Sequence, residues 1–180
     1  MSFNIKQHIE KKFREATSSG ELFDTFQQAL KLKLKDIDLY KILLGNMALN
    51  ADEIKMFTEK LCREFEDLKY DLYMWSANIL ENTLSEENLE AAFAYYLKAS
   101  ELDRTNHLPF MSILKMYNVD FDLPPKEKII SIIENAINEV KIKSHLFREM
   151  ADFYGYIGDE IKKRKCLTLA AQYKRRENMS

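Results

Sequence analysis

The sequence has few residues that break helices, with four glycines and three prolines in 180 residues. This scarcity disfavours a turn-rich β protein and favours long helices. Its two cysteines, Cys62 and Cys166, lie far apart and neither has a CxxC partner, so we expect neither a disulfide framework nor a zinc site. Both fall in apolar helical segments, where packing in the core is the usual role of a free thiol.

No run of about 18 consecutive apolar residues is present, so no membrane-spanning helix is expected. The first fifteen residues alternate Phe3, Ile5 and Ile9 with lysines, which is typical of an amphipathic helix rather than a signal peptide. Together with the unpaired cysteines, which suit a reducing compartment, these absences predict a cytoplasmic protein without a membrane segment.

Sequence signatures of catalysis are missing too. There is no HExxH, GxxxxGK[ST] or GxGxxG motif, and no Ser/His/Asp or Cys/His set recurs at a plausible spacing. The histidines His8, His107 and His145 are far apart in repeat position, and His8 is expected to pack in the core. We therefore expect no enzymatic activity, no cofactor and no metal site.

A repeat of about 35 residues runs along the whole chain. Four sets of positions recur at this spacing, and most of their members are apolar or small. The sets are Ile5, Tyr40, Trp75, Phe110 and Phe147; Leu22, Phe57, Ala92 and Ile129; Phe26, Leu61, Tyr96, Ile133 and Leu167; and Ala29, Glu64, Ala99, Ala136 and Ala170. A shared period of this length predicts stacked structural units, and stacked units of this kind mostly serve as binding scaffolds.

Each unit is predicted to be a pair of antiparallel helices, because apolar residues recur at i, i+3, i+4 and i+7. The first helices are expected at Phe3–Ala16, Ile37–Leu49, Asp71–Leu84, Asn106–Asn118 and Ser144–Ile157. The second helices are expected at Gly20–Lys35, Ala51–Leu68, Glu86–Leu102, Pro125–Lys141 and Asp159–Arg176. Ser85 is a predicted N-cap, and Gly158 is expected to end its helix with a positive φ. The prediction is thus an all-α protein with one domain, residues 1–180.

The last unit resembles a tetratricopeptide repeat. That family places an aromatic residue, Leu, a small residue and Tyr on its first helix, then Gly at the turn and an aromatic and Ala on the second. The matching residues here are Phe147, Met150, Ala151, Tyr154, Gly158, Leu167 and Ala170. Through the repeat, the resemblance covers nearly the whole chain and implies an α-α superhelix of about five helix-turn-helix units.

In that family the first helices line the concave face of the superhelix, where partner proteins bind. Positions that face away from the predicted core in the last three units are Tyr73, Met111, Lys115, Asn118, His145, Arg148, Asp152 and Tyr156. This mixture of aromatic and cationic groups suits an extended or helical peptide with acidic and apolar side chains. The resemblance therefore implies a non-catalytic scaffold or adaptor that binds a protein or peptide.

An alternative is a half-a-tetratricopeptide subunit of an RNA-processing assembly, a related repeat that Trp75 resembles. That repeat has Arg after the alanine of the second helix, whereas Phe93 follows Ala92 here. The charge distribution also disfavours nucleic acid: residues 50–103 hold thirteen acids against five Lys or Arg, a net charge of −8. Residues 156–180 hold three acids against seven bases, a net charge of +4, which leaves open a basic end that meets an acidic partner.

Overall fold

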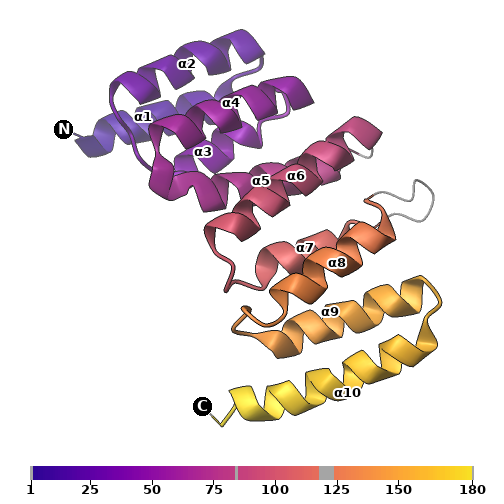
Figure 1. Cartoon of the computed structure of the whole chain (residues 1–180). Helices are drawn as coiled ribbons and strands as arrows, with labels where there is room; N and C mark the ends of the chain where they lie inside the picture. Colours follow the sequence, from indigo (N-terminus) through magenta and orange to yellow (C-terminus); the bar gives the residue numbers. More distant parts are fainter. Residues whose placement is uncertain (1, 84, 118–123, 180) are drawn as a thin grey trace. The chain divides into compact units, whose positions relative to one another are not determined.

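The computed structural model describes residues 2–83, 85–117 and 124–179, which form ten α-helices, one 3-10 turn and no β-strand (Figure 1). The prediction of an all-α protein is therefore confirmed for these residues. The chain divides into two compact units, Met1–Leu80 and Glu81–Ser180. Within the described ranges, every helix is too short or too polar to span a lipid bilayer.

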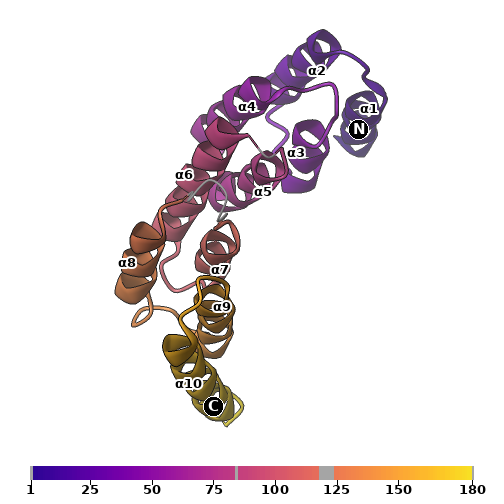
Figure 2. The ribbon, with the colours of Figure 1, turned by 90° about the vertical axis from the view of Figure 1, so that its right-hand side faces the viewer.

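The first unit is built of short antiparallel helices that pack on their neighbours. Helix α1 contacts both α2 and α3, and α3 contacts α4. The elements are α1 (Ser2–Glu15), α2 (Ser19–Lys31), α3 (Ile37–Leu44), α4 (Ala51–Glu64), the 3-10 turn η1 (Glu66–Leu68) and α5 (Lys69–Glu81). Figure 2 shows α1 and α3 in one layer of this unit and α2 and α4 in the other.

The second unit repeats this arrangement. Helix α7 contacts α6, α8 and α9, and α9 packs along α10. The helices are α6 (Glu86–Leu102), α7 (Leu108–Lys115), α8 (Lys126–Ala136), α9 (Lys143–Tyr156) and α10 (Glu160–Glu177). Because α7 and α9 lie side by side in one layer (Figure 2), their outer faces form a continuous surface within this unit.

The predicted helix ends are confirmed where a side chain or a glycine fixes them. Ser85 accepts a hydrogen bond from the backbone N–H of Asn88 and so caps α6. Asn50 and Glu53 form a capping box at the start of α4. Gly158 has φ +81°, so the turn between α9 and α10 uses a backbone conformation that costs glycine least.

The first helices of the second and fourth pairs are shorter than predicted. Helix α3 ends at Leu44 rather than Leu49, because the chain then turns and uses Asn46 to bind α1. The Asn46 amide donates to the carbonyls of Phe13 (2.8 Å) and Ala16 (3.2 Å), which lie at and just beyond the end of α1. The turn thus satisfies carbonyls that a helix end leaves unpaired. Helix α7 ends at Lys115 rather than Asn118.

The repeat predicts the core well for the second helices. Phe26, Leu61, Tyr96 and Ile133 are all buried, while the fifth member of the set, Leu167 in α10, is exposed. Along the first helices, Tyr40 and Phe110 are buried. Ile5 is exposed, and Trp75 and Phe147 are half-buried. These first helices therefore leave part of their apolar surface open to solvent.

The expected burial of His8 is wrong, because the side chain is exposed. The buried face of α1 consists of Ile9 and Phe13, and His8 is one residue away, about 100° around the helix. Cys62 and Cys166 are both buried and form no disulfide, as predicted.

The carboxylate of Glu177, the last residue of α10, caps the start of α9. It accepts hydrogen bonds from the backbone N–H groups of Lys143 (2.8 Å) and Ser144 (3.1 Å) and from the Ser144 hydroxyl. Burial disfavours its charge, but these bonds outweigh burial and hold the pKa of Glu177 below its usual value. The two helices of the last pair are thereby joined at their far end as well as at Gly158.

Candidate functional sites

A surface groove lies between α7 and α9 in the second unit and has a volume of about 350 Å³. Its position follows from the packing of α7: Phe110, Ile113 and Leu114 face the core, so Lys115 at the end of the helix faces outward. The lining residues are Leu114, Lys115, Tyr117, Glu149, Asp152, Phe153 and Tyr156.

Three aromatic rings form one side of this α7–α9 groove. Phe153 is buried, and the Tyr117 ring packs edge-to-face against it with the centroids 5.4 Å apart. Tyr117 also meets Tyr156 at 6.1 Å and 90°. Tyr156 keeps 63% of its surface exposed, so it offers a large and partly fixed contact area of the kind common at protein interfaces.

Charged groups form the other side. The Lys115 ammonium lies 3.4 Å from the Glu149 carboxylate, and 61% of the lysine side chain is exposed against 18% of the glutamate. Because most of the Lys115 side chain is open to solvent, its ammonium can also meet an acidic group of a ligand. Asp152 is exposed one helical turn beyond Glu149 and also lines the groove.

The structure brings three of the predicted binding residues together, since Lys115, Asp152 and Tyr156 all line the groove. Arg148 and His145 are exposed on α9 outside it, and Met111 is half-buried in α7. The His145 ring lies 5.2 Å from that of His107, so the expectation that these two histidines are far apart is wrong. Burial, followed by the proximity of His145, lowers the pKa of His107. Asn118 lies outside the described residues.

Tyr73 corrects the prediction, because it belongs to the first unit and its side chain is buried. The buried face of α5 is broad and comprises Leu72, Tyr73, Ser76, Ala77 and Leu80. The side of the helix that carries Tyr73 therefore faces the core and not the solvent. Burial is the main cause that raises the pKa of the Tyr73 phenol, and Cys62 is the next. Tyr73 is therefore unsuitable as a contact residue.

A second and larger groove lies in the first unit, where sequence reasoning predicted no site. Its volume is about 790 Å³, and it is lined by Phe13, Arg14, Ala16, Asp38, Lys41, Ile42, Gly45, Asn46, Met47 and Trp75. We call it the Trp75 groove. The Trp75 indole N–H donates to the Lys41 carbonyl at 3.2 Å, which fixes the ring against the end of α3.

The sequence contains a signal for this groove in Gly45 and Trp75. A Cβ atom added at Gly45 would lie 3.1 Å from the Lys41 carbonyl oxygen, which is a tight contact, and 4.0 Å from the Trp75 ring, which is an ordinary one. The Trp75 side chain is half-buried. The single tryptophan of the chain thus lies partly open to solvent at the edge of a groove.

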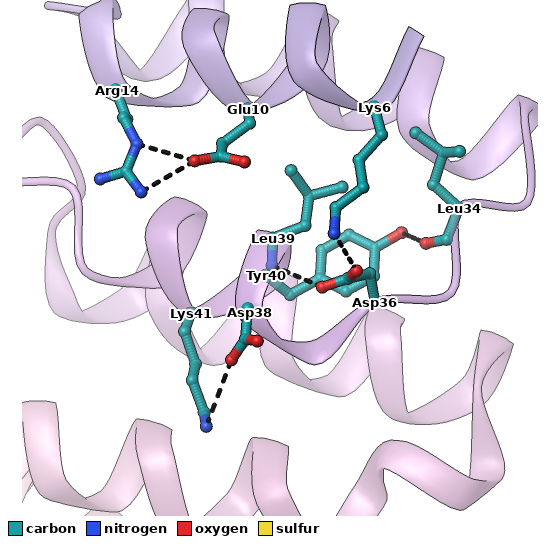
Figure 3. A network of polar contacts seen from close by, with 9 residues as sticks. All are labelled: Lys6, Glu10, Arg14, Leu34, Asp36, Asp38, Leu39, Tyr40 and Lys41. Atoms are coloured by element: carbon teal, nitrogen blue, oxygen red, sulfur yellow. Dashed lines mark hydrogen bonds and ion pairs between the residues drawn. The ribbon is translucent and has the colours of Figure 1, made fainter. Parts of the chain in front are cut away.

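Most charges beside the Trp75 groove are paired within the unit (Figure 3). Arg14 donates twice to Glu10, at 3.0 and 2.8 Å, and Lys41 lies 3.9 Å from Asp38. Lys6 pairs with Asp36, whose carboxylate also caps α3 at Leu39. Burial of Asp36 is outweighed by Lys6 and the Leu39 N–H, which hold its pKa below the usual value. Lys6 and Asp36 thus join α1 to the start of α3, whereas the other two pairs lie within single helices.

Both grooves combine aromatic side chains with cations and carboxylates. Among the described residues, neither lining includes a serine, cysteine or histidine, and no group of three metal-ligating side chains occurs. What the grooves offer is aromatic surface next to cations and carboxylates, which suits a peptide or protein ligand.

Comparison of the chain with protein-family models, curated proteins and solved structures found no match. The relation to tetratricopeptide repeats therefore rests on the residues and the repeat alone.

Proposed function

We propose that this protein is a non-catalytic scaffold or adaptor of the tetratricopeptide-like kind, acting in the cytoplasm. In this proposal, five helix pairs form one α-α superhelix, and a partner protein or peptide binds along the concave face made by the first helix of each pair. The repeat of about 35 residues and the layering of first and second helices within each unit support it (Figure 2).

The observation that carries the proposal is the α7–α9 groove. Two first helices meet there and present Lys115, Tyr117 and Tyr156 together on one surface. An acidic side chain of the partner would pair with Lys115 or with Arg148 nearby on α9, while an apolar side chain would rest against the tyrosines. The favoured ligand is therefore an extended or helical peptide with acidic and apolar residues.

Reversing both cations tests this proposal. Lys115→Glu combined with Arg148→Glu is expected to lower capture of the main partner from native lysate at least tenfold, measured by quantitative mass spectrometry. Both side chains are exposed, so the melting temperature should change by only a few degrees.

The matched control is Lys126→Glu with Lys141→Glu, which changes the charge equally at exposed positions of the same unit outside the groove. This control should capture the partner as the unaltered chain does. Undiminished capture by the folded Lys115/Arg148 variant would place the ligand elsewhere and contradict the proposal.

A further inference from the structure

The outer side of α10 carries a continuous exposed stripe. Its members recur at i, i+3, i+4, i+7, i+10, i+11 and i+14, so they share one helix face. All are exposed: Ile161, Arg164, Lys165, Thr168, Ala171, Gln172 and Arg175. We call this set the α10 stripe. Ile161 is a large apolar residue, yet 85% of its surface is exposed.

Equivalent positions of the earlier second helices are covered. By the repeat spacing, Arg164 and Ala171 of α10 correspond to Phe93 and Ser100 of α6, both of which are buried. The Lys128 ammonium of α8 lies 4.8 Å from the Phe93 ring, so the next second helix reaches this face.

Helix α8 keeps the same positions apolar, with Ile130 and Ile137, and both are half-buried. In α10 the same face is open, and an arginine stands where the earlier helices have Phe93 or Ile130. A helix that packs on this face of α10 must therefore lie against a positive charge. The corresponding faces of α6 and α8 present an apolar residue at this position instead.

The positive charge of α10 is not balanced by its own acids. The helix has seven Lys and Arg residues against Glu160 and Glu177. Glu160 pairs with Lys163 at 3.0 Å, and Glu177 is bound to the start of α9. Among the residues that the structure describes, Arg164, Lys165 and Arg175 form no ion pair. Their positive charges are therefore available to a ligand.

We propose that the α10 stripe docks an acidic amphipathic α-helix of a partner protein. Small Thr168 and Ala171 in the middle of the stripe let a second helix backbone approach closely. Arg164 and Arg175 lie eleven residues apart, about 16 Å along the helix axis, and would pair with carboxylates three turns apart on the ligand. Ile161 would bury its side chain against an apolar residue of the same ligand helix.

Charge disfavours α1 or α10 of a second copy of the chain as the ligand. Stacking of α10 on α1 of another copy would bring it against Lys6, Lys11, Lys12 and Arg14, opposed only by Glu10 and Glu15. Pairing of α10 with itself would oppose two basic stripes.

Nucleic acid is disfavoured because the stripe has no exposed aromatic ring for bases. The one aromatic residue of α10, Tyr173, stacks on Phe147 at 5.3 Å. The apolar and small residues of the stripe instead suit a helical protein surface.

The test uses two labelled 21-residue peptides with fluorescence anisotropy at about 50 mM salt, where screening is weak. One contains three repeats of Leu-Glu-Ala-Ala-Leu-Glu-Ala, and the other has Gln at every Glu position. The full chain should bind the Glu peptide at least tenfold more tightly than the Gln peptide. Arg164→Glu with Arg175→Glu should remove this preference, while Lys126→Glu with Lys141→Glu should keep it. Arg164→Gln with Arg175→Gln removes the two positive charges without reversing them, and it should weaken the preference for the Glu peptide.

Several results would overturn the inference. One is absence of Glu-peptide binding, and another is unchanged binding by the Arg164/Arg175 variants. The chain could instead bind a 20-nucleotide single strand more tightly than the Glu peptide. If the same variants abolish that binding, the stripe is a nucleic-acid site. Self-association that these variants abolish would assign it to a second copy. The Lys115/Arg148 experiment addresses another surface, so failure here is distinguishable from failure of the proposed function.

Discussion

Replacing Tyr40 with alanine should destabilise the first unit by about 3–5 kcal/mol, the usual cost of deleting a large buried aromatic side chain. Tyr40 is fully buried, and its ring lies 5.6 Å from that of Phe65. Its hydroxyl donates to the Leu34 carbonyl at 2.6 Å, which holds the connection before α3. The substitution removes the packing and this hydrogen bond together. Denaturant unfolding followed by circular dichroism measures the change in free energy.

Tyr40→Phe separates the two contributions, because it keeps the ring and deletes only the hydroxyl. This control should cost about 0.5–1.5 kcal/mol, the net value of one hydrogen bond. A loss below about 1 kcal/mol for Tyr40→Ala would contradict the packing of the first unit described above.

Phe153→Ala should destabilise the second unit by a similar amount, about 3–5 kcal/mol. Phe153 is buried and packs against Tyr117 at 5.4 Å and Tyr154 at 5.7 Å. Since it also forms the floor of the α7–α9 groove, its loss should release Tyr117 and weaken partner capture. Denaturant unfolding measures the first effect, and capture at a temperature where the variant is folded measures the second.

Phe153→Leu is the matched control for this experiment. It keeps most of the buried apolar volume and should retain most of the stability. Equal stability of the alanine variant and the unaltered chain would show that Phe153 does not support the groove.

The sequence predicts the order and type of the elements because the repeat is strong and the caps are local. Ser85 and Gly158 act through neighbouring residues, so both were predictable without tertiary structure. Burial of Phe26, Leu61, Tyr96 and Ile133 was predictable too, since each second helix packs one face inward. The arrangement of the pairs in one superhelix and the assignment of one domain stay predictions.

Where the structure differs from the sequence-based predictions, the cause is a tertiary contact. Helix α3 ends early because Asn46 binds α1, a contact over 33 residues of sequence. Tyr73 was assigned to the surface because helix phase alone does not show how wide the buried face of α5 is. The Trp75 groove was missed because a sequence pattern does not show that Gly45 and Trp75, far apart in the sequence, lie side by side. Of the two grooves, only the α7–α9 groove contains residues that the sequence predicts, namely Lys115, Asp152 and Tyr156.

Photo-cross-linking can show directly whether a partner protein binds on the face formed by the first helices of the pairs. The cross-linker p-benzoylphenylalanine would replace Tyr156 at the α7–α9 groove or, as the control, Ser131 on α8, and both side chains are exposed. Each chain would be irradiated in native lysate, and the products identified by mass spectrometry. We expect a cross-link to the captured partner from position 156 and none from position 131. A partner that cross-links from position 131 and not from position 156 would contradict it.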